Sequence, residues 1–135
     1  MTRLALALTL VVALLVPSAA QAKYKDFRMP SNNIGCGFSD DPLYLRCDIL
    51  QSSDAPPRPR SCDLDYGYAY GLKRKGRSQV LCAGDTVMNR DAPVLRYGRT
   101  KRIGPFTCTS RRTGLTCKNL SGHGFFLSRA DIRRF

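Results

Sequence analysis

Six cysteines set the strongest limit on what this chain can fold into. They are Cys36, Cys47, Cys62, Cys82, Cys108 and Cys117. An even number of cysteines behind an export signal is typical of a disulfide framework, because an oxidising compartment preserves the bonds. Zinc-binding cysteines usually stand two to four residues apart, and these do not. We therefore expect three disulfides, no metal site and no cofactor.

The export signal lies at the N-terminus. Residues 4–16 form a run of 13 residues that is apolar except for Thr9, followed by Ala20-Gln21-Ala22. The run is shorter than the roughly 20 residues of a membrane-spanning helix, and the alanines fit an A-x-A cleavage site. We expect residues 1–22 to be a signal peptide. Residues 23–135 should then form one domain without a membrane span, secreted or held in the periplasm or cell envelope.

The spacing of the first two cysteines predicts a β-hairpin. If Cys36 faces Cys47, the turn is centred between Asp41 and Pro42, in a stretch rich in turn residues. The same register gathers apolar pairs on the cysteine face: Ile34 opposite Ile49 and Phe38 opposite Leu45. The other face receives Gly35 with Asp48, and Gly37 with Arg46. This separation of faces is what a half-buried hairpin requires, so we expect a Cys36–Cys47 bond.

The last two cysteines fit the same scheme. Pairing Cys108 with Cys117 centres a turn on Arg112 and Thr113 and places Thr109 opposite Thr116, a favourable cross-strand pair. Cys62 and Cys82 are left to pair by elimination. Their bond would close a larger loop that contains three alternating tyrosines, a candidate stacking surface for sugars or bases or else a core edge: Tyr66, Tyr68 and Tyr70.

The fold class is mostly β: a small disulfide-stapled antiparallel domain of short hairpins. Further strands are predicted over residues 67–72, 79–82, 93–97, 103–109, 115–119 and 123–128. Ser128 and Asp131 could cap a short C-terminal helix ending at Phe135. The proline-rich residues 52–61 predict an exposed extended loop. An Ile-Gly step near each cysteine hairpin hints at an internal duplication, although the intervening lengths do not match.

Positive charge dominates the expected mature chain. Arg3 leaves with the signal peptide, so residues 23–135 carry 21 Lys and Arg against 10 Asp, a net charge of +11. The basic residues concentrate in predicted turns. Candidate contacts for a polyanion are Lys73, Arg74, Lys75, Arg77, Arg99, Lys101, Arg102, Arg111 and Arg112. Such side chains attract phosphate or carboxylate polymers, but they also suit an ordinary solvated surface.

The only histidine, His123, is a candidate functional or structural residue. It could act as a general base, but one histidine cannot build a multi-histidine metal site, and no G-x-S-x-G motif is present. We assign no catalytic residue. Gly122-His123-Gly124 is more typical of a structural histidine bonded to a backbone carbonyl. Two aspartate pairs could supply carboxylates, although their spacing defines no metal site: Asp63 with Asp65, and Asp85 with Asp91.

Several blocks in fixed order resemble a family of small secreted bacterial proteins, of a kind common in actinobacteria, with six cysteines and a domain of unknown function. The blocks are PSNNIGC (30–36), LRCDI (45–49), VLCAGDT (80–86), VLRYG (94–98) and GHGF (122–125). The family often has Trp-Gly where this chain has Tyr66-Gly67. The resemblance implies secretion and a disulfide-rich domain, and it supplies no catalytic or binding residue.

These features favour a secreted, non-enzymatic binding or envelope-associated protein. Its expected partners are anionic envelope polymers or extracellular nucleic acid. The alternative is a small secreted hydrolase that acts on an anionic polymer.

Overall fold

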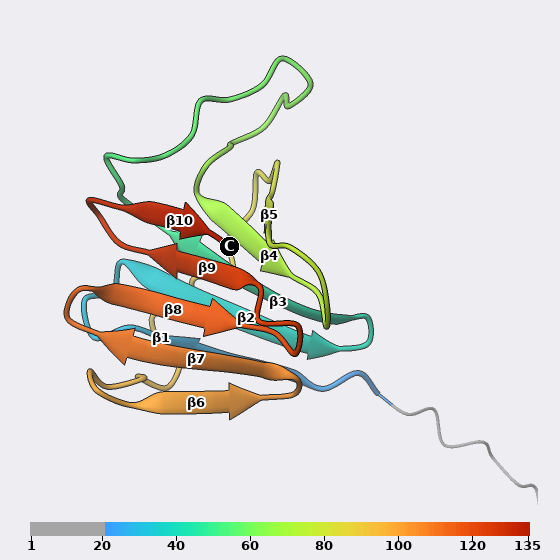
Figure 1. Cartoon of the computed structure of the whole chain (residues 1–135), viewed down its shortest axis with the longest axis vertical. Coiled ribbons are helices and arrows are strands. Elements are labelled where there is room, and N and C mark those ends of the chain that lie inside the picture. The colour runs from blue at the N-terminus through green and yellow to red at the C-terminus, as the bar shows by residue number, and fades with distance from the viewer. Residues whose placement is uncertain (1–20) are drawn as a thin grey trace, which may run out of the picture.

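Two five-stranded antiparallel sheets face each other in residues 21–135, the part of the chain that the computed structural model describes (Figure 1). The first sheet contains β1 (Tyr24–Arg28), β2 (Ile34–Asp40), β3 (Leu43–Ile49), β4 (Ala69–Leu72) and β5 (Gln79–Val80). The second contains β6 (Thr100–Ile103), β7 (Phe106–Arg111), β8 (Gly114–Lys118), β9 (Gly124–Leu127) and β10 (Ile132–Arg134). The described residues form no helix, hence none able to cross a membrane.

The two sheets share one strand order. Each is a meander in which every strand pairs with its neighbour in sequence. In each sheet a disulfide joins the second strand to the third: Cys36–Cys47 joins β2 to β3, and Cys108–Cys117 joins β7 to β8. The halves thus match in strand order although their loop lengths differ.

The predicted hairpins and all three disulfides are confirmed. Cys36 faces Cys47 across a two-residue connection, Asp41-Pro42, whose peptide bond is cis. The cross-strand partners expected on both faces of this hairpin are all present. Cys108 faces Cys117, and Cys62 is bonded to Cys82.

Two strand predictions need correction, and one strand was not predicted. Residues 93–97 form no strand and contribute only one isolated bridge, from Val94 to Arg28. The strand expected over 103–109 is divided, because Gly104 adopts a positive φ of 54° and turns the chain between β6 and β7. Strand β1 was not anticipated. Its pattern is mostly polar, because Phe27 alone is buried among its five residues.

The expected C-terminal helix is also wrong. The Ser128 hydroxyl does accept a hydrogen bond from the Asp131 amide, at 2.9 Å, but this contact closes a turn between β9 and β10. Residues after the turn pair with β9, Ile132 opposite Leu127 and Arg133 opposite Phe126. Ile132–Arg134 are too few to form a stable helix, because the first helical turn is entropically unfavourable. The edge of β9 instead provides backbone hydrogen-bond partners for all three residues.

The core lies between the sheets. The inward side chains include Phe38 and Phe106, whose rings meet edge to face at 6.0 Å, and Tyr70 and Phe125, at 6.1 Å. The two hairpin disulfides sit at its centre, with all four cysteines fully buried.

Candidate polyanion-binding surface

The outer face of the first sheet is covered by the chain itself. Residues 81–95, here called the strap, run from β5 toward β6 across it. Arg46 on β3 donates hydrogen bonds from Nη1 to the Asp85 carboxylate and from Nη2 to the Asp85 carbonyl, at 2.8 and 2.7 Å. Gly35 lies close under the strap, since a Cβ there would lie 2.8 Å from the Met88 sulfur. The strap therefore covers this face, apart from a hollow beside the β3–β4 loop that Asp48, Ala69 and Asp85 line.

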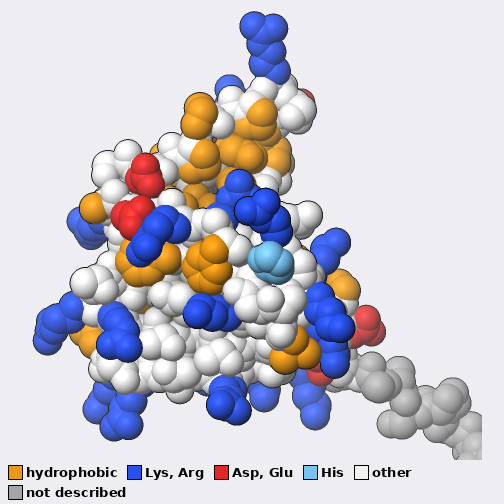
Figure 2. Space-filling view, viewed as in Figure 1, with side chains coloured by type: hydrophobic (Ala, Val, Ile, Leu, Met, Phe, Trp, Pro, Cys, Tyr) orange, Lys and Arg blue, Asp and Glu red, His pale blue; other side chains and the backbone are white. Residues whose placement is uncertain are grey.

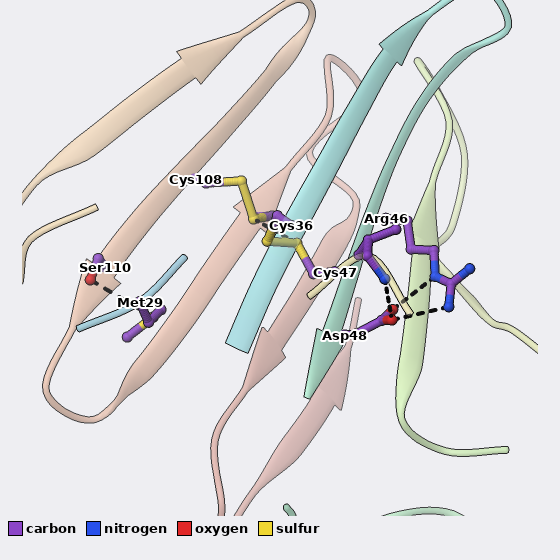
Figure 3. The surroundings of a disulfide bond; sticks show 9 residues. Met29, Cys36, Arg46, Cys47, Asp48, Cys108 and Ser110 are labelled. Carbon is purple, nitrogen blue, oxygen red and sulfur yellow. Dashed lines mark hydrogen bonds and ion pairs between the residues drawn. A yellow bond between two sulfur atoms is a disulfide. The ribbon is translucent and has the colours of Figure 1, made fainter. Parts of the chain in front are cut away.

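Asp48 is the buried anchor of the strap. Its side chain accepts hydrogen bonds from Arg46 Nε and Nη2 (Figure 3). It also accepts from Thr86 Oγ1 and from the Val87 amide. Burial acts to lower the pKa of Arg46, but the bonds to Asp48 and Asp85 outweigh it and raise that pKa. The same contact lowers the pKa of Asp85. The side chains that the hairpin register placed on the non-cysteine face thus hold the strap.

The outer face of the second sheet carries polar and basic side chains instead (Figure 2). Period-2 alternation opposite the buried Phe106, Cys108, Leu115 and Cys117 places these side chains on it. Lys and Arg are distributed over the face in Figure 2, whereas Asp side chains lie at its margins. The outward set is Thr100, Arg102, Thr107, Thr109, Arg111, Thr116, Lys118, Phe126 and Arg133.

A row of residues crosses all five strands of this face. Cross-strand partners connect it in the order Thr100, Thr109, Thr116, Phe126 and Arg133. The hydroxyls of Thr100 and Thr109 are hydrogen-bonded at 3.0 Å. We call this line the threonine row. A parallel line one pleat away holds Arg102, Thr107 and Lys118.

Aromatic rings hold three cations at or beside this face. The Arg112 guanidinium lies 5.1 Å from the Tyr97 ring centroid, and Lys118 Nζ lies 5.7 Å from that of Phe135. Arg133 lies 4.6 Å from the Phe126 ring and also pairs with Asp131. Within residues 21–135, Arg46 and Arg133 are the basic side chains in ion pairs, so Arg112 and Lys118 keep their charge unneutralised.

The basic β4–β5 turn, residues 73–77, docks against the β8–β9 turn. Asn119 joins them: its amide nitrogen donates to the carbonyls of Lys73 and Gly76, at 3.0 and 2.8 Å. Its side-chain oxygen accepts from the Ser121 and His123 amides. This places the predicted Lys73, Arg74, Lys75 and Arg77 next to Lys118, although they belong to the other sheet.

His123 occupies the second of these turns. Gly122 has a φ of 78°, and a Cβ at Gly124 would collide with the Cys117 carbonyl. The backbone conformation and packing therefore explain why glycine flanks His123 on both sides. Among the described residues the imidazole has neither a hydrogen bond nor a carboxylate within ion-pair distance. This corrects the expected bond to a carbonyl. The backbone of His123 bonds Asn119 instead.

The other predicted cations divide by strand face. Arg102 and Arg111 point outward, and Arg112 lies in the adjoining β7–β8 turn. Lys101 faces Cys108 across the ladder and lines a hollow with Phe27 and Val94, away from the outer face. Arg99, exposed before β6, lies outside the outward set. Sequence reasoning missed Lys118 and Arg133, although the alternation through Thr116-Cys117-Lys118 pointed to the first.

The three alternating tyrosines do not share a surface. Tyr70 is in the core, its hydroxyl donates to the Gly67 carbonyl at 2.9 Å, and burial raises its pKa to about 12. Tyr68 is 42% exposed, and Tyr66 is partly exposed. A stacking surface made of all three is therefore excluded.

Sulfur atoms also cluster in the core (Figure 3). The Sγ atoms of Cys36, Cys47 and Cys117 lie within 4.8 Å of one another, close enough to suggest a metal site. Each belongs to a disulfide, however, and metal binding by cysteine needs a thiolate. The cluster is two disulfides in contact.

The fold and this face define a small disulfide-stapled β-sandwich with one face covered by its own chain and the other open and basic. Over residues 6–135 the chain matches the model of DUF6636, a family of unknown function, and it belongs to that family. No curated protein and no solved structure matched it. Its three disulfides indicate an oxidising, extracytoplasmic environment.

Proposed function

We propose that this is a secreted, non-enzymatic binding protein that holds single anionic polymer chains against the outer face of the second sheet. The observation that carries the proposal is the placement of Arg112 and Lys118 over aromatic rings and away from carboxylates. An ion pair would neutralise these charges, whereas a ring leaves them available. Side chains already held in place also lose less conformational entropy when a ligand binds.

The polymer path follows the threonine row. Arg102 and Lys118 border the row on one side, and Arg111, two residues after Thr109, borders it on the other. The row spans four strand spacings, about 19 Å, which suits one extended chain. Threonine hydroxyls donate to phosphate or carboxylate oxygens, and arginine forks bind them in bidentate fashion. Envelope polymers and extracellular single-stranded nucleic acid both present such groups.

The basic β4–β5 turn extends this path. Because Asn119 fixes residues 73–77 beside the end of β8, a chain leaving the row past Lys118 meets Lys73, Arg74, Lys75 and Arg77. All four side chains are exposed. Contacts from both sheets thus belong to one continuous surface.

Salt titration of affinity tests the proposal. With about four anionic contacts on a single chain, a fourfold rise in salt should weaken binding on the order of fiftyfold. Removing two of them in the Arg102→Ala/Lys118→Ala variant should flatten the log–log salt slope by about 1.4. The probes are a single-stranded DNA oligomer, poly(glycerol phosphate) and neutral dextran.

Lys101→Ala is the matched control. Lys101 and Arg102 are neighbours on β6 and carry the same charge, but they point to opposite sides of the strand. Arg102→Ala should weaken binding severalfold, and Lys101→Ala should change it little. Equal losses in the two variants would show that only net charge matters and would reject a defined face. Binding of the DNA oligomer and of poly(glycerol phosphate) that ignores salt would reject the polyanion ligand itself.

A further inference from the structure

The β3–β4 loop, residues 50–68, forms an arm that projects beyond the sandwich (Figure 1). The Cys62–Cys82 disulfide ties it to the strap, and so does the bridge between Asp65 and Ala83. Arg58 Nη1 donates to the Cys62 carbonyl at 3.1 Å, inside the arm. The other two disulfides lie in the core, whereas this one fixes the shape of a protruding loop. The arm therefore presents a preformed surface.

Tyr68 is the centre of that surface. Its side chain is 42% exposed and lines three adjoining hollows, of about 290, 570 and 500 Å³. Leu50 and Leu64, each about half exposed, line their walls. Figure 2 shows apolar side chains gathered over the arm, above the basic face. The two larger hollows lie within the range typical of small-ligand sites.

Polar groups accompany the ring. Asp63, Asp65 and Tyr66 line the largest hollow together with Tyr68. Among the described residues, the carboxylates of Asp63 and Asp65 form no ion pair, and neither receives a side-chain or backbone hydrogen bond. They are free acceptors for hydroxyl donors beside an amphipathic ring. Arg58 lines the same hollow, with its Nη1 bonded to the Cys62 carbonyl, but the two carboxylates outnumber it. The hollow therefore favours neutral hydroxyl groups over phosphate or carboxylate groups.

From this arrangement we infer that the Tyr68 surface binds a neutral, hydroxyl-rich glycan. One face of a pyranose ring is formed by C–H groups, which pack on the tyrosine ring, while its equatorial hydroxyls reach Asp63 and Asp65. The surface is distinct from the threonine row, since most of its lining residues belong to the arm and the strap. The others are Asp48, Ile49 and Ala69 of the first sheet and Arg129 of the β9–β10 turn. The two sites together would fit an envelope in which neutral sugars and anionic polymers occur side by side.

The inference is tested with the mature protein and two neutral oligosaccharides, chitohexaose and maltohexaose, by NMR titration. Saturable binding of at least one, with a Kd on the order of 0.1–1 mM and shifts concentrated at residues 63–68, is expected. Tyr68→Ala should weaken it about tenfold or more, Asp65→Asn less, and Tyr68→Phe should retain most of it. Tyr24→Ala is the control, because Tyr24 is 60% exposed but lies on β1.

Three outcomes would overturn the inference: no saturable binding to either sugar, shifts that map outside the arm, or unchanged affinity in Tyr68→Ala. The wild-type titration decides the first two even if a variant is poorly folded. Binding of chitohexaose or maltohexaose should survive in the Arg102→Ala/Lys118→Ala variant. The salt titration tests the polyanion proposal by itself, so the two proposals can fail separately.

Discussion

The Sγ atoms of Cys47 and Cys117 lie 4.0 Å apart, so the disulfide of one sheet touches the disulfide of the other at the centre of the core. The two bridges therefore act as packing groups as well as cross-links. Neither sulfur pair can be removed without loss of contact across the sheet interface.

The three disulfides should differ in what their removal does. The chain-entropy model gives each bridge about 2.5–3.5 kcal/mol, with Cys62–Cys82 the largest because it closes the longest loop. Cys36→Ala/Cys47→Ala should cost more than this model predicts, since it also leaves a cavity against Cys117. Cys62→Ser/Cys82→Ser should free the arm while the sandwich unfolds cooperatively. Urea unfolding and amide hydrogen exchange measure both effects, and an intact arm without Cys62–Cys82 would contradict the second expectation.

Asp48→Ala should destabilise the protein by about 3 kcal/mol, because it leaves the largely buried Arg46 without its bidentate partner and releases the strap. Asp91→Ala, in an exposed part of the strap, is the control and should change the unfolding free energy by less than about 0.5 kcal/mol. Denaturant titration of both variants gives the comparison. Equal effects would mean that Asp48 does not anchor the strap.

Tyr70 should make the protein sensitive to alkali. Its pKa is raised to about 12 in the folded state, so the phenol ionises near pH 10 in the unfolded chain but stays neutral in the folded one. The unfolded state then binds fewer protons, and the unfolding free energy should fall by about 1.4 kcal/mol per pH unit between these values. Tyr70→Phe removes the share of Tyr70 in this dependence, while Tyr24 and Tyr44, whose pKa values burial also raises, keep theirs. If the unfolding free energies of the variant and the wild type fall in parallel across pH 9–12, Tyr70 does not contribute to the alkaline sensitivity.

Lys23 and Asp40 provide a test of signal-peptide cleavage. The Lys23 backbone nitrogen lies 2.6 Å from a carboxylate oxygen of Asp40. If cleavage follows Ala22, this nitrogen becomes a charged α-amino group, and the hydrogen bond becomes charge-assisted. Protein starting at Lys23 should be more stable than protein that retains Ala22, by up to about 1 kcal/mol. Asp40→Asn should abolish the difference; intact-mass analysis of the secreted chain establishes the cleavage point.

The alternation of apolar and polar residues within short segments predicted the strand pairing better than it predicted the binding surface. The Cys36–Cys47 register followed from alternation over a few residues, because one slip would have moved every apolar side chain to the other face. The sequence did not predict β1 and β10, because these edge strands bury one side chain or none. β1 buries only Phe27, and β10 exposes Arg133 and Arg134. Neither strand has a hydrophobic pattern to detect.

The binding surface was only partly predictable for a different reason. Charge and turn residues identified Arg111, Arg112 and the 73–77 turn, but neighbouring Lys101 and Arg102 look equivalent until strand register separates them. The docking of that turn through Asn119 joins residues more than 40 positions apart. Such contacts follow from the packing of one sheet on the other, which no local pattern contains.

The sequential order of the strands also governs how the chain can fold as it emerges. The first sheet can complete its ladder from residues 24–80 alone, because each of its strands pairs with the next. Its apolar inner side, including Phe38 and Leu45, stays uncovered until β7 to β9 arrive. A chain delivered from its N-terminus thus passes through a half-sandwich whose bare face is prone to aggregation, and the second sheet, residues 100–134, ends that exposure.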